Sequence, residues 1–184
     1  MEQQLNAVYK DLADKHIFIT GGASGIGAEM VRAFSAQGAR VSFIDFDSGS
    51  ATKLCADIAS KGSETPWFRE VDVTDVPALE KSIEDAAAEF GPIYALINNV
   101  ANDTRHSPEE LDEEGWRKSM AVNLDPVFFA SKAAYKSMSK NNGGSIINLS
   151  SIPALLGLAD LSGYITAKAA IIGMTKALAT DYGE

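Results

Sequence analysis

The residues TGGASGIG, from Thr20 to Gly27, join a short apolar run to an amphipathic segment. The run KHIFIT (15–20) is rich in β-branched and aromatic residues, which predicts a buried strand. In segment 25–38 apolar residues recur with the helical period and a glycine ends the pattern. A glycine turn in this position can approach a pyrophosphate closely, and the helix N-terminus attracts the anion. Such a turn is often only structural, but its place between strand and helix is the one that phosphate binding requires.

The same alternation continues along the chain. Further strands are expected at 40–45, 65–73, 93–99 and 145–151, and helices at 48–62, 77–91, 112–140 and 162–182. Alternating elements imply parallel strands with right-handed crossovers, and therefore a doubly wound α/β sheet, a Rossmann fold with helices on both faces. Ligands of such sheets bind outside the carboxyl ends of the strands. Pro126 interrupts one helix and predicts a kink beside Asn123, which packing alone would explain equally well.

Composition excludes several classes of protein. The 184 residues are 46% hydrophobic and 22% charged, as in an ordinary globular domain. The net charge of −9 argues against nucleic acids and anionic membranes as partners, because both require a basic surface. No apolar leader or membrane-spanning run is visible, and the single Cys55 fits a reducing compartment. We therefore expect a cytoplasmic protein.

Carboxylates end the second and third predicted strands. Asp45 lies 18 residues after Gly27, where an acid can bind the hydroxyls of an adenosine ribose and repel a 2′-phosphate. Because no basic residue stands at 44, 46 or 47, NAD is favoured over NADP as cofactor. Asp72 precedes Val73, a candidate contact for adenine. Each aspartate could instead cap the helix that follows it.

A serine, a tyrosine and a lysine stand close together near the end of the chain. In SSIPALLGLADLSGYITAKAA (150–170), Tyr164 follows Ser151 by thirteen residues and precedes Lys168 by four. Positions i and i+4 share one face of a helix. A free tyrosine ionises only at about pH 10, and a nearby ammonium favours the phenolate. Ser151 ends the fifth predicted strand, so its hydroxyl can hold a substrate oxygen in the same cleft. With the glycine turn, this spacing indicates a proton-transfer site.

With these motifs, the chain from Lys15 to Glu184 resembles the short-chain dehydrogenase/reductase family. TGGASGIG is similar to the family's TGxxxGIG, and INNVA (97–101) is similar to its NNAG segment. Asn123, within AVNL, matches the family's helix asparagine. Val100 and Ala101 depart from NNAG, since they replace smaller residues near the expected path of the cofactor.

The resemblance implies specific roles. Tyr164 would be the general acid/base, and Lys168 would lower the pKa of this tyrosine and bind the nicotinamide ribose. Ser151 would orient the substrate oxygen. Asn123 would help to hold a water in a proton relay to Lys168. The expected NAD-binding residues are Gly21, Ser24, Gly25, Ile26, Gly27, Asp45, Phe46, Asp72, Val73, Asn98, Asn99 and Val100, together with Tyr164 and Lys168.

The length of the chain also departs from the family pattern, because family members usually continue for two more strands and a substrate-covering segment. We expect residues 1–14 to be an N-terminal extension and 15–184 to be an NAD-binding domain that is incomplete at its C-terminus. The fifth strand would then lack its next neighbour and form an open edge.

The loop NNVANDTRH (98–106) is rich in hydrogen-bonding groups. It resembles the family branch that oxidises aldoses at C1, such as xylose and galactose dehydrogenases. Asn102, with Ser151 and Tyr164, is expected to contact the substrate, because buried sugar hydroxyls need polar partners. Alternatively, the loop residues after Asn102 pair with one another and stiffen it: Asp103, Arg105 and His106. His106 and the distant His16 do not form a metal-ligand set, so no metal is expected.

We expect an enzyme that acts on a polyol or a sugar. Most specifically, it should transfer a hydride from C1 of an aldose to NAD. A carbonyl or 3-ketoacyl reductase of the same family and a non-catalytic NAD-binding protein are the alternatives. Helices 112–140 and 162–182 are apolar on more than one side, which predicts a homo-oligomer, and the family resemblance implies a dimer or tetramer built on these helices. The residues concerned are Phe128, Phe129, Tyr135, Ile171, Ile172 and Met174.

Overall fold

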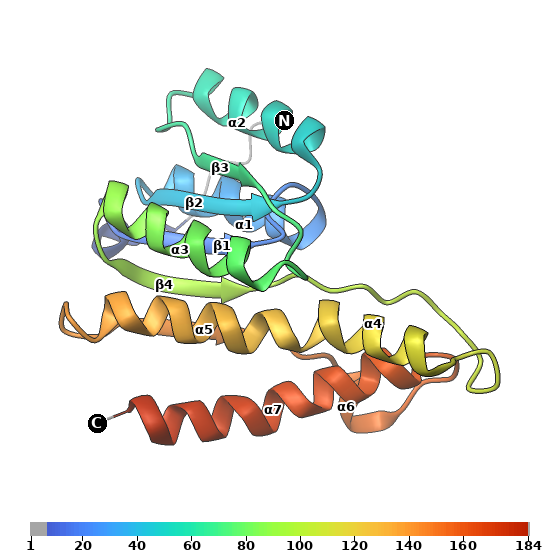
Figure 1. The fold of residues 1–184 in the computed structure, drawn as a ribbon. Coiled ribbons are helices and arrows are strands. Elements are labelled where there is room, and N and C mark those ends of the chain that lie inside the picture. The colour runs from blue at the N-terminus through green and yellow to red at the C-terminus, as the bar shows by residue number, and fades with distance from the viewer. Residues whose placement is uncertain (1–6, 184) are drawn as a thin grey trace.

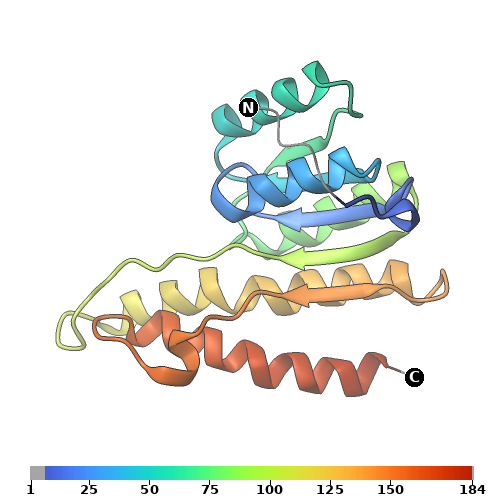
Figure 2. The same ribbon diagram turned by 180° about the vertical axis from the view of Figure 1, so that it is seen from behind.

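The structure, a computed structural model, describes residues 7–183 (Figures 1 and 2). The five strands are parallel and lie in the order β3-β2-β1-β4-β5, which confirms the doubly wound sheet. Residues 1–6 of the predicted extension, and Glu184, lie outside the described residues. The elements are η1 (Lys10–Leu12), β1 (His16–Thr20), α1 (Gly25–Ala36), β2 (Arg40–Asp45), α2 (Ser48–Ser60), β3 (Trp67–Glu70), α3 (Val76–Phe90), β4 (Ile93–Asn98), α4 (Glu113–Asn123), α5 (Asp125–Met138), β5 (Ser145–Asn148), α6 (Pro153–Leu156) and α7 (Ser162–Tyr182).

Each face of the sheet carries its own hydrophobic core. Consecutive side chains of a strand point to opposite faces, so Ile17 and Ile19 of β1 join one core and Phe18 joins the other. Helices α1 and α2 cover the first core, and α3 and α5 cover the second (Figures 1 and 2). Because both faces are covered, β1 is apolar throughout its centre rather than alternating. Helix α7 packs along α4 and contacts α5.

Two strands end earlier than the sequence predicts. β3 has four residues rather than the predicted 65–73. Beyond it, Asp72 accepts hydrogen bonds from the backbone N–H and the hydroxyl of Thr74, and these bonds turn the chain. β5 ends at Asn148, so Ser151 follows the strand instead of ending it. Both differences lie at the carboxyl ends, where side chains compete with the sheet for backbone groups.

The predicted helix 112–140 is two helices that meet at Leu124, whose φ of −123° and ψ of −57° break the helical path. Pro126 lies in the first turn of α5, where its missing N–H has no helical partner to lose. The predicted kink beside Asn123 is therefore confirmed. The short elements η1 and α6 are not predicted by the sequence, because a single turn is too short to display a period.

β5 forms one edge of the described sheet, and Ile147 on it is 48% exposed. The open edge expected for the fifth strand is thus present in the part of the chain that the structure describes. Among residues 7–183, no helix combines the length and the apolar character needed to cross a membrane.

His16, at the start of β1, is a buried polar residue of the core. Its Nδ1 lies 2.9 Å from the carbonyl oxygen of Gly91, and its Nε2 lies 2.8 Å from the hydroxyl of Ser42. Burial lowers the pKa of the imidazole below its ordinary value of 6.5, and the nearby Arg40 acts in the same direction. The neutral ring can donate at Nδ1 and accept at Nε2, so the folded protein favours the neutral form.

We expect the free energy of unfolding to fall as the pH falls below 6.5. In this range the unfolded chain binds a proton at His16 while the folded chain does not, and the loss continues until the pH passes the lower pKa of the folded state. His16→Asn keeps a donor near Gly91 but cannot be protonated. Urea unfolding at about pH 7.5 and about pH 5.5 should give a larger loss for the wild type than for His16→Asn. Equal losses would contradict the assignment.

Candidate active site

The turn between β1 and α1 is built from glycines that admit no side chain. Gly21 has a φ of +71°, in the left-handed region that favours glycine. A Cβ at Gly22 would lie 2.5 Å from the ring of Phe43, and one at Gly27 would overlap the carbonyl oxygen of Gly21. Helix α1 therefore begins in close contact with the turn that precedes it.

The N-terminus of α1 offers unpaired donors to the solvent. Ser24 is the N-cap, but its side chain does not cap the helix. The first backbone N–H groups of a helix have no partner within it, and the dipole adds positive charge there. Ser24 and Gly25 are exposed, and Ile26 is 68% exposed, so this end is accessible. These donors and the tight turn fit the diphosphate of a dinucleotide cofactor.

Asp45 links this turn to the end of β2. Its Oδ2 accepts a hydrogen bond of 2.9 Å from the N–H of Ala23, and its Oδ1 accepts one of 3.0 Å from the N–H of Asp47. Asp47, not Asp45, caps α2 by accepting from the N–H of Ser50. Capping of the following helix thus does not explain Asp45, whose carboxylate stands at the mouth of the cleft described next.

The cap of α3 is also a different aspartate from the one considered in the sequence. Asp75 accepts from the N–H of Ala78, whereas Asp72 accepts from Thr74. Asp72 is thus used in a turn and remains at the edge of the sheet, next to the buried Val73.

A cleft of about 680 Å³ opens over the carboxyl ends of the strands. Its walls come from the segments that follow β1, β2, β3 and β4, together with Val122 of α4. The strand order reverses between β1 and β4, which is the usual ligand position in this architecture. Phe46, beside Asp45, is 77% exposed and forms part of one wall. The cleft is lined by Gly21, Ser24, Ile26, Asp45, Phe46, Asp47, Val71, Asp72, Val73, Thr74, Asn99, Val100, Ala101, Asn102, Asp103 and Val122.

Several predicted site residues do not line this cleft. Gly27 is packed against the turn, and Gly25 lines a neighbouring hollow. Asn98 is 3% exposed, and its amide donates to Asn148 Oδ1 at 2.8 Å and to Ser131 Oγ at 3.2 Å. The side chain of Asn98 therefore joins β4 to β5 and α5. The other four are the predicted catalytic residues, which are not among the residues that line the cleft: Asn123, Ser151, Tyr164 and Lys168.

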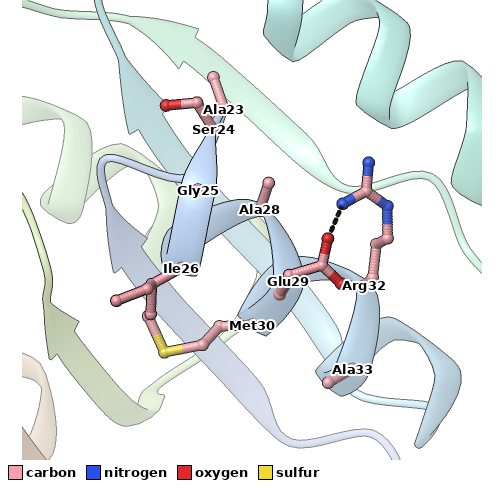
Figure 3. Close-up of a pocket in the computed structure, with 9 residues that line it drawn as sticks. All are labelled: Ala23, Ser24, Gly25, Ile26, Ala28, Glu29, Met30, Arg32 and Ala33. Carbon is pink, nitrogen blue, oxygen red and sulfur yellow. Dashed lines mark hydrogen bonds and ion pairs between the residues drawn. The ribbon is translucent and has the colours of Figure 1, made fainter.

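A second hollow, of about 830 Å³, runs along the outer side of α1 (Figure 3). It is wide open to solvent and is lined by small and aliphatic residues and by the ion pair of Glu29 with Arg32, 2.6 Å apart. This hollow lies along the helix rather than over the strand ends. Of the predicted site residues, only Ser24, Gly25 and Ile26 line it. We therefore place the candidate site in the cleft over the strand ends.

Lys168 is a buried cation, 2% exposed, in the first half of α7. Its Nζ donates a 2.7 Å hydrogen bond to the carbonyl oxygen of Leu149 and lies 5.8 Å from the centre of the Tyr164 ring. Burial lowers the pKa of the ammonium from its ordinary value, because apolar surroundings disfavour the charged form. Tyrosine and lysine thus share a helix face as predicted.

Ser150 completes the connection between β5 and α7. Its hydroxyl donates a 2.7 Å hydrogen bond to the backbone carbonyl of Lys168. Leu149 and Ser150 therefore contact the same residue of α7, and Ser151 follows them directly. The sequence does not predict this role of Ser150, apart from its place directly before Ser151.

Asn123, 1% exposed, holds the start of the polar loop. Its Nδ2 donates to the carbonyl oxygen of Asn102 at 3.0 Å, and its Oδ1 accepts from the N–H of Asn102 at 2.7 Å. Asn102 in turn accepts through Oδ1 from the N–H and the hydroxyl of Thr104, at 3.0 and 2.6 Å. The backbone and the side-chain oxygen of Asn102 are thus engaged by the protein, whereas its Nδ2 makes no hydrogen bond within residues 7–183.

The alternative in which Asp103, Arg105 and His106 pair with one another is wrong. Within residues 7–183 no hydrogen bond or ion pair joins these three side chains. Arg105 donates to the carbonyl oxygen of Ala159 at 3.1 Å, and the N–H of His106 donates to that of Asp160 at 2.9 Å. The loop is stiffened, but by the segment that precedes α7.

Comparison with known proteins identifies the family. The sequence profile described as short chain dehydrogenase matches residues 15–184. The "Probable galactose dehydrogenase GalD" of Rhizobium meliloti is 42% identical over 175 residues, which cover 95% of this chain and 68% of that protein. A D-xylose 1-dehydrogenase of Caulobacter vibrioides is 40% identical over 179 residues, 97% of this chain and 70% of that protein.

A solved structure agrees with the sequence comparisons. The short-chain dehydrogenase/reductase of Serratia marcescens superposes with a TM-score of 0.87 at 32% identity and covers 94% of this chain and 70% of that one. The chain belongs to the short-chain dehydrogenase family and is an oxidoreductase of CH–OH groups. Dehydrogenases of this family use nicotinamide cofactors, and the donors of the cleft fit such a dinucleotide.

Proposed function

We propose that this protein is an NAD-dependent dehydrogenase that oxidises the C1 hydroxyl of an aldose. The observation that carries the proposal is the buried Lys168 beside Tyr164, joined by Leu149 and Ser150 to the strand end that leads to Ser151. The names of two relatives at 40–42% identity, a galactose and a xylose dehydrogenase, support an aldose as substrate.

The proposed chemistry divides a proton and a hydride between two acceptors. When bound, the nicotinamide ring accepts a hydride. Tyr164 takes the proton of the C1 hydroxyl, so that C1 becomes the carbonyl carbon of a lactone as its hydrogen leaves. Lys168 places its ammonium beside this tyrosine, with Nζ 5.8 Å from the centre of the ring. Ser151 donates a hydrogen bond to the substrate oxygen.

Asn123 is proposed to support the site by fixing the loop that begins at Asn102, because its amide is engaged by that backbone at 2.7 and 3.0 Å. The water relay through Asn123 to Lys168 stays a prediction. This prediction is tested by comparing the solvent isotope effect on kcat between the wild type and Asn123→Ala.

The reaction is tested by mixing the protein with NAD and a panel of pentoses, hexoses and simple secondary alcohols and following the absorbance of the reduced cofactor. We expect reduction with at least one aldose, and a lactone as the product. Turnover of simple alcohols with no response to any aldose would reject the sugar as substrate.

NAD is proposed as the cofactor because Asp45 stands where a 2′-phosphate would be repelled. We expect the wild type to prefer NAD over NADP by a factor of about ten to several hundred. Asp45→Asn keeps one oxygen for the N–H of Ala23 or Asp47 and removes the charge, so the preference should narrow by about tenfold. The measurement is kcat/KM with each cofactor at fixed substrate.

Asp103→Asn is the matched control for this experiment. Asp103 also lines the cleft but comes from the loop after β4 rather than from the end of β2. Its substitution removes the same charge and should leave the NAD preference unchanged. An NADP-preferring wild type, or an equal effect of both substitutions, would contradict the assignment of Asp45.

Asn102 is proposed to donate a hydrogen bond from its Nδ2 to a sugar hydroxyl. Asn102→Asp keeps the side-chain oxygen that accepts from Thr104, replaces the Nδ2 donor by an acceptor and adds a negative charge. We expect kcat/KM for an aldose to fall by about ten- to a hundredfold, because one buried hydroxyl loses its partner. A simple secondary alcohol should change little, and an equal loss for every substrate would contradict the sugar contact.

A carbonyl or 3-ketoacyl reductase is the second candidate. Ile152, Leu155 and Leu156, which follow Ser151, are 72%, 75% and 80% exposed and offer an apolar surface near the site. The same panel extended with 3-ketoacyl thioesters and the reduced cofactor separates the two, since reduction of thioesters without aldose oxidation would favour this candidate.

The protein is also proposed to form homodimers or homotetramers through α4, α5 and α7. Trp116 and Phe128 are 39% and 40% exposed on these helices, and Phe128 packs edge-on against Phe129. Tyr135 instead stacks on Tyr182, so it serves the contact of α5 with α7 within the subunit. Light scattering at micromolar concentration tests the proposal, and a monomer would reject it.

A further inference from the structure

The segment before α7 is held by the polar loop after β4, although the two lie 54 residues apart. Arg105 donates to the carbonyl oxygen of Ala159, and the N–H of His106 donates to the carbonyl oxygen of Asp160, at 3.1 and 2.9 Å. Figures 1 and 2 agree that the loop between β4 and α4 meets the segment between α6 and α7 at one end of the molecule.

Asp160 has an unusual backbone conformation at this contact. Its φ is +61°, in the left-handed region that glycine, asparagine and aspartate tolerate and β-branched residues avoid. Such a conformation persists when the surrounding contacts maintain it. The two carbonyl groups bound by the loop are those of Asp160 and of its neighbour Ala159, so the loop and the conformation support one another.

Ala159 and Asp160 form a corner before α7, and the first turn of the helix has little freedom to move beyond this corner. No side chain caps the helix at Leu161, which is 4% exposed. A Cβ at Gly163 would lie 2.6 Å from the hydroxyl of Ser119 and 2.9 Å from its Cβ, so α7 touches α4 directly. The direction of the turn is therefore set by the corner and by α4, and Tyr164 is the next residue.

The loop has a second anchor at its other end. Asn123 binds both backbone groups of Asn102, and the turn of Asn102 with Thr104 fixes the residues between. Asn102 to His106 thus forms a bridge from the end of α4 to the segment just before α7.

We propose that Arg105 and Asp160 are positioning residues for Tyr164. By holding the corner before α7, they fix the tyrosine hydroxyl relative to Ser151 and the bound alcohol, and neither of them touches the substrate. The inference rests on the proposed role of Tyr164 as the proton acceptor. It assigns to part of the polar loop a role in the rate of proton transfer rather than in sugar recognition.

The test compares three substitutions of Asp160. Val disfavours the left-handed conformation, whereas Asn and Gly permit it. We expect Asp160→Val to lower kcat by about tenfold, with the cofactor KM within about twofold of the wild type. Asp160→Asn and Asp160→Gly should restore kcat to within about threefold. If the carboxylate of Asp160 rather than its backbone conformation were important, all three substitutions would lower kcat alike. That result would overturn the proposal.

Arg105 provides the matching test on the loop. Arg105→Ala should lower kcat by about three- to tenfold at unchanged cofactor KM, and Arg105→Lys, which keeps a donor, should recover part of the loss. Equal kcat for wild type, Arg105→Ala and Arg105→Lys would overturn the role of this residue.

Amide hydrogen exchange separates this inference from the proposed function. In the absence of any substrate, the first hydrogen-bonded amides of α7, beginning with Ile165, whose N–H donates to the carbonyl oxygen of Leu161 at 2.8 Å, should exchange faster in Asp160→Val and Arg105→Ala than in the wild type or Asp160→Asn. Unchanged exchange in both disrupted variants would overturn the proposal, whatever the activity. If the wild type oxidises none of the alcohols offered, the proposed function fails, while the exchange comparison still decides whether these residues hold the start of α7.

Discussion

In a Tyr164→Phe variant we expect kcat to fall by about a thousandfold or more, while the affinity for the cofactor stays within about threefold of the wild-type value. The substitution removes one oxygen and keeps the ring, which lies 5.8 Å from the ammonium of Lys168. Helix α7 should therefore fold unchanged, and only the proton acceptor is lost. Steady-state kinetics and calorimetric titration with NAD measure the two quantities.

Lys168→Met is the companion variant. Methionine matches much of the length of lysine and tolerates a buried site, but it cannot carry charge or donate to the carbonyl oxygen of Leu149. We expect kcat to fall at least as far as in Tyr164→Phe, because the site loses the positive charge beside its proton acceptor. Normal turnover by Lys168→Met at neutral pH, or loss of NAD binding by folded Tyr164→Phe, would contradict the proposed roles.

The parts of the fold that follow from local pattern are predictable from the sequence. The apolar run 15–20 and the period of 25–38 place β1 and α1 within two residues of their observed bounds. The i and i+4 spacing of Tyr164 and Lys168 is a property of one helix, and α7 begins at the predicted Ser162. These features depend only on neighbours in the chain.

Features that depend on a distant partner are not predictable in the same way. Asn98 and Asn99 are adjacent and chemically identical, yet Asn98 is buried against Asn148 and Ser131 while Asn99 lines the cleft. Strand geometry places them on opposite sides, but only the assembled sheet shows which side meets the cleft. Likewise, nothing near Arg105 in the sequence indicates Ala159 as its partner.

The glycine turn illustrates both cases. The motif predicts that glycines are needed, but not which of them touches which atom. The structure separates Gly25, whose Cβ would meet open space, from Gly27, whose Cβ would overlap the carbonyl oxygen of Gly21 and lie 2.8 Å from Asn99 Nδ2. The need for glycine at position 27 therefore arises from close packing, and at position 25 from its φ of +52°.

Because Gly27 is closely packed, a side chain at this position should strongly affect cofactor binding. Gly27→Ala should weaken cofactor binding by about a hundredfold, because α1 must move away from the turn and its free N–H groups then no longer point to the diphosphate. The overlap should also cost about 1–3 kcal/mol of unfolding free energy. Gly173→Ala, in α7, is the control: its Cβ meets nothing within 4 Å, so NAD binding should be unchanged and the helix slightly stabilised. Calorimetric titration of both folded variants with NAD decides, and wild-type affinity in Gly27→Ala would show that the cofactor does not bind at the start of α1.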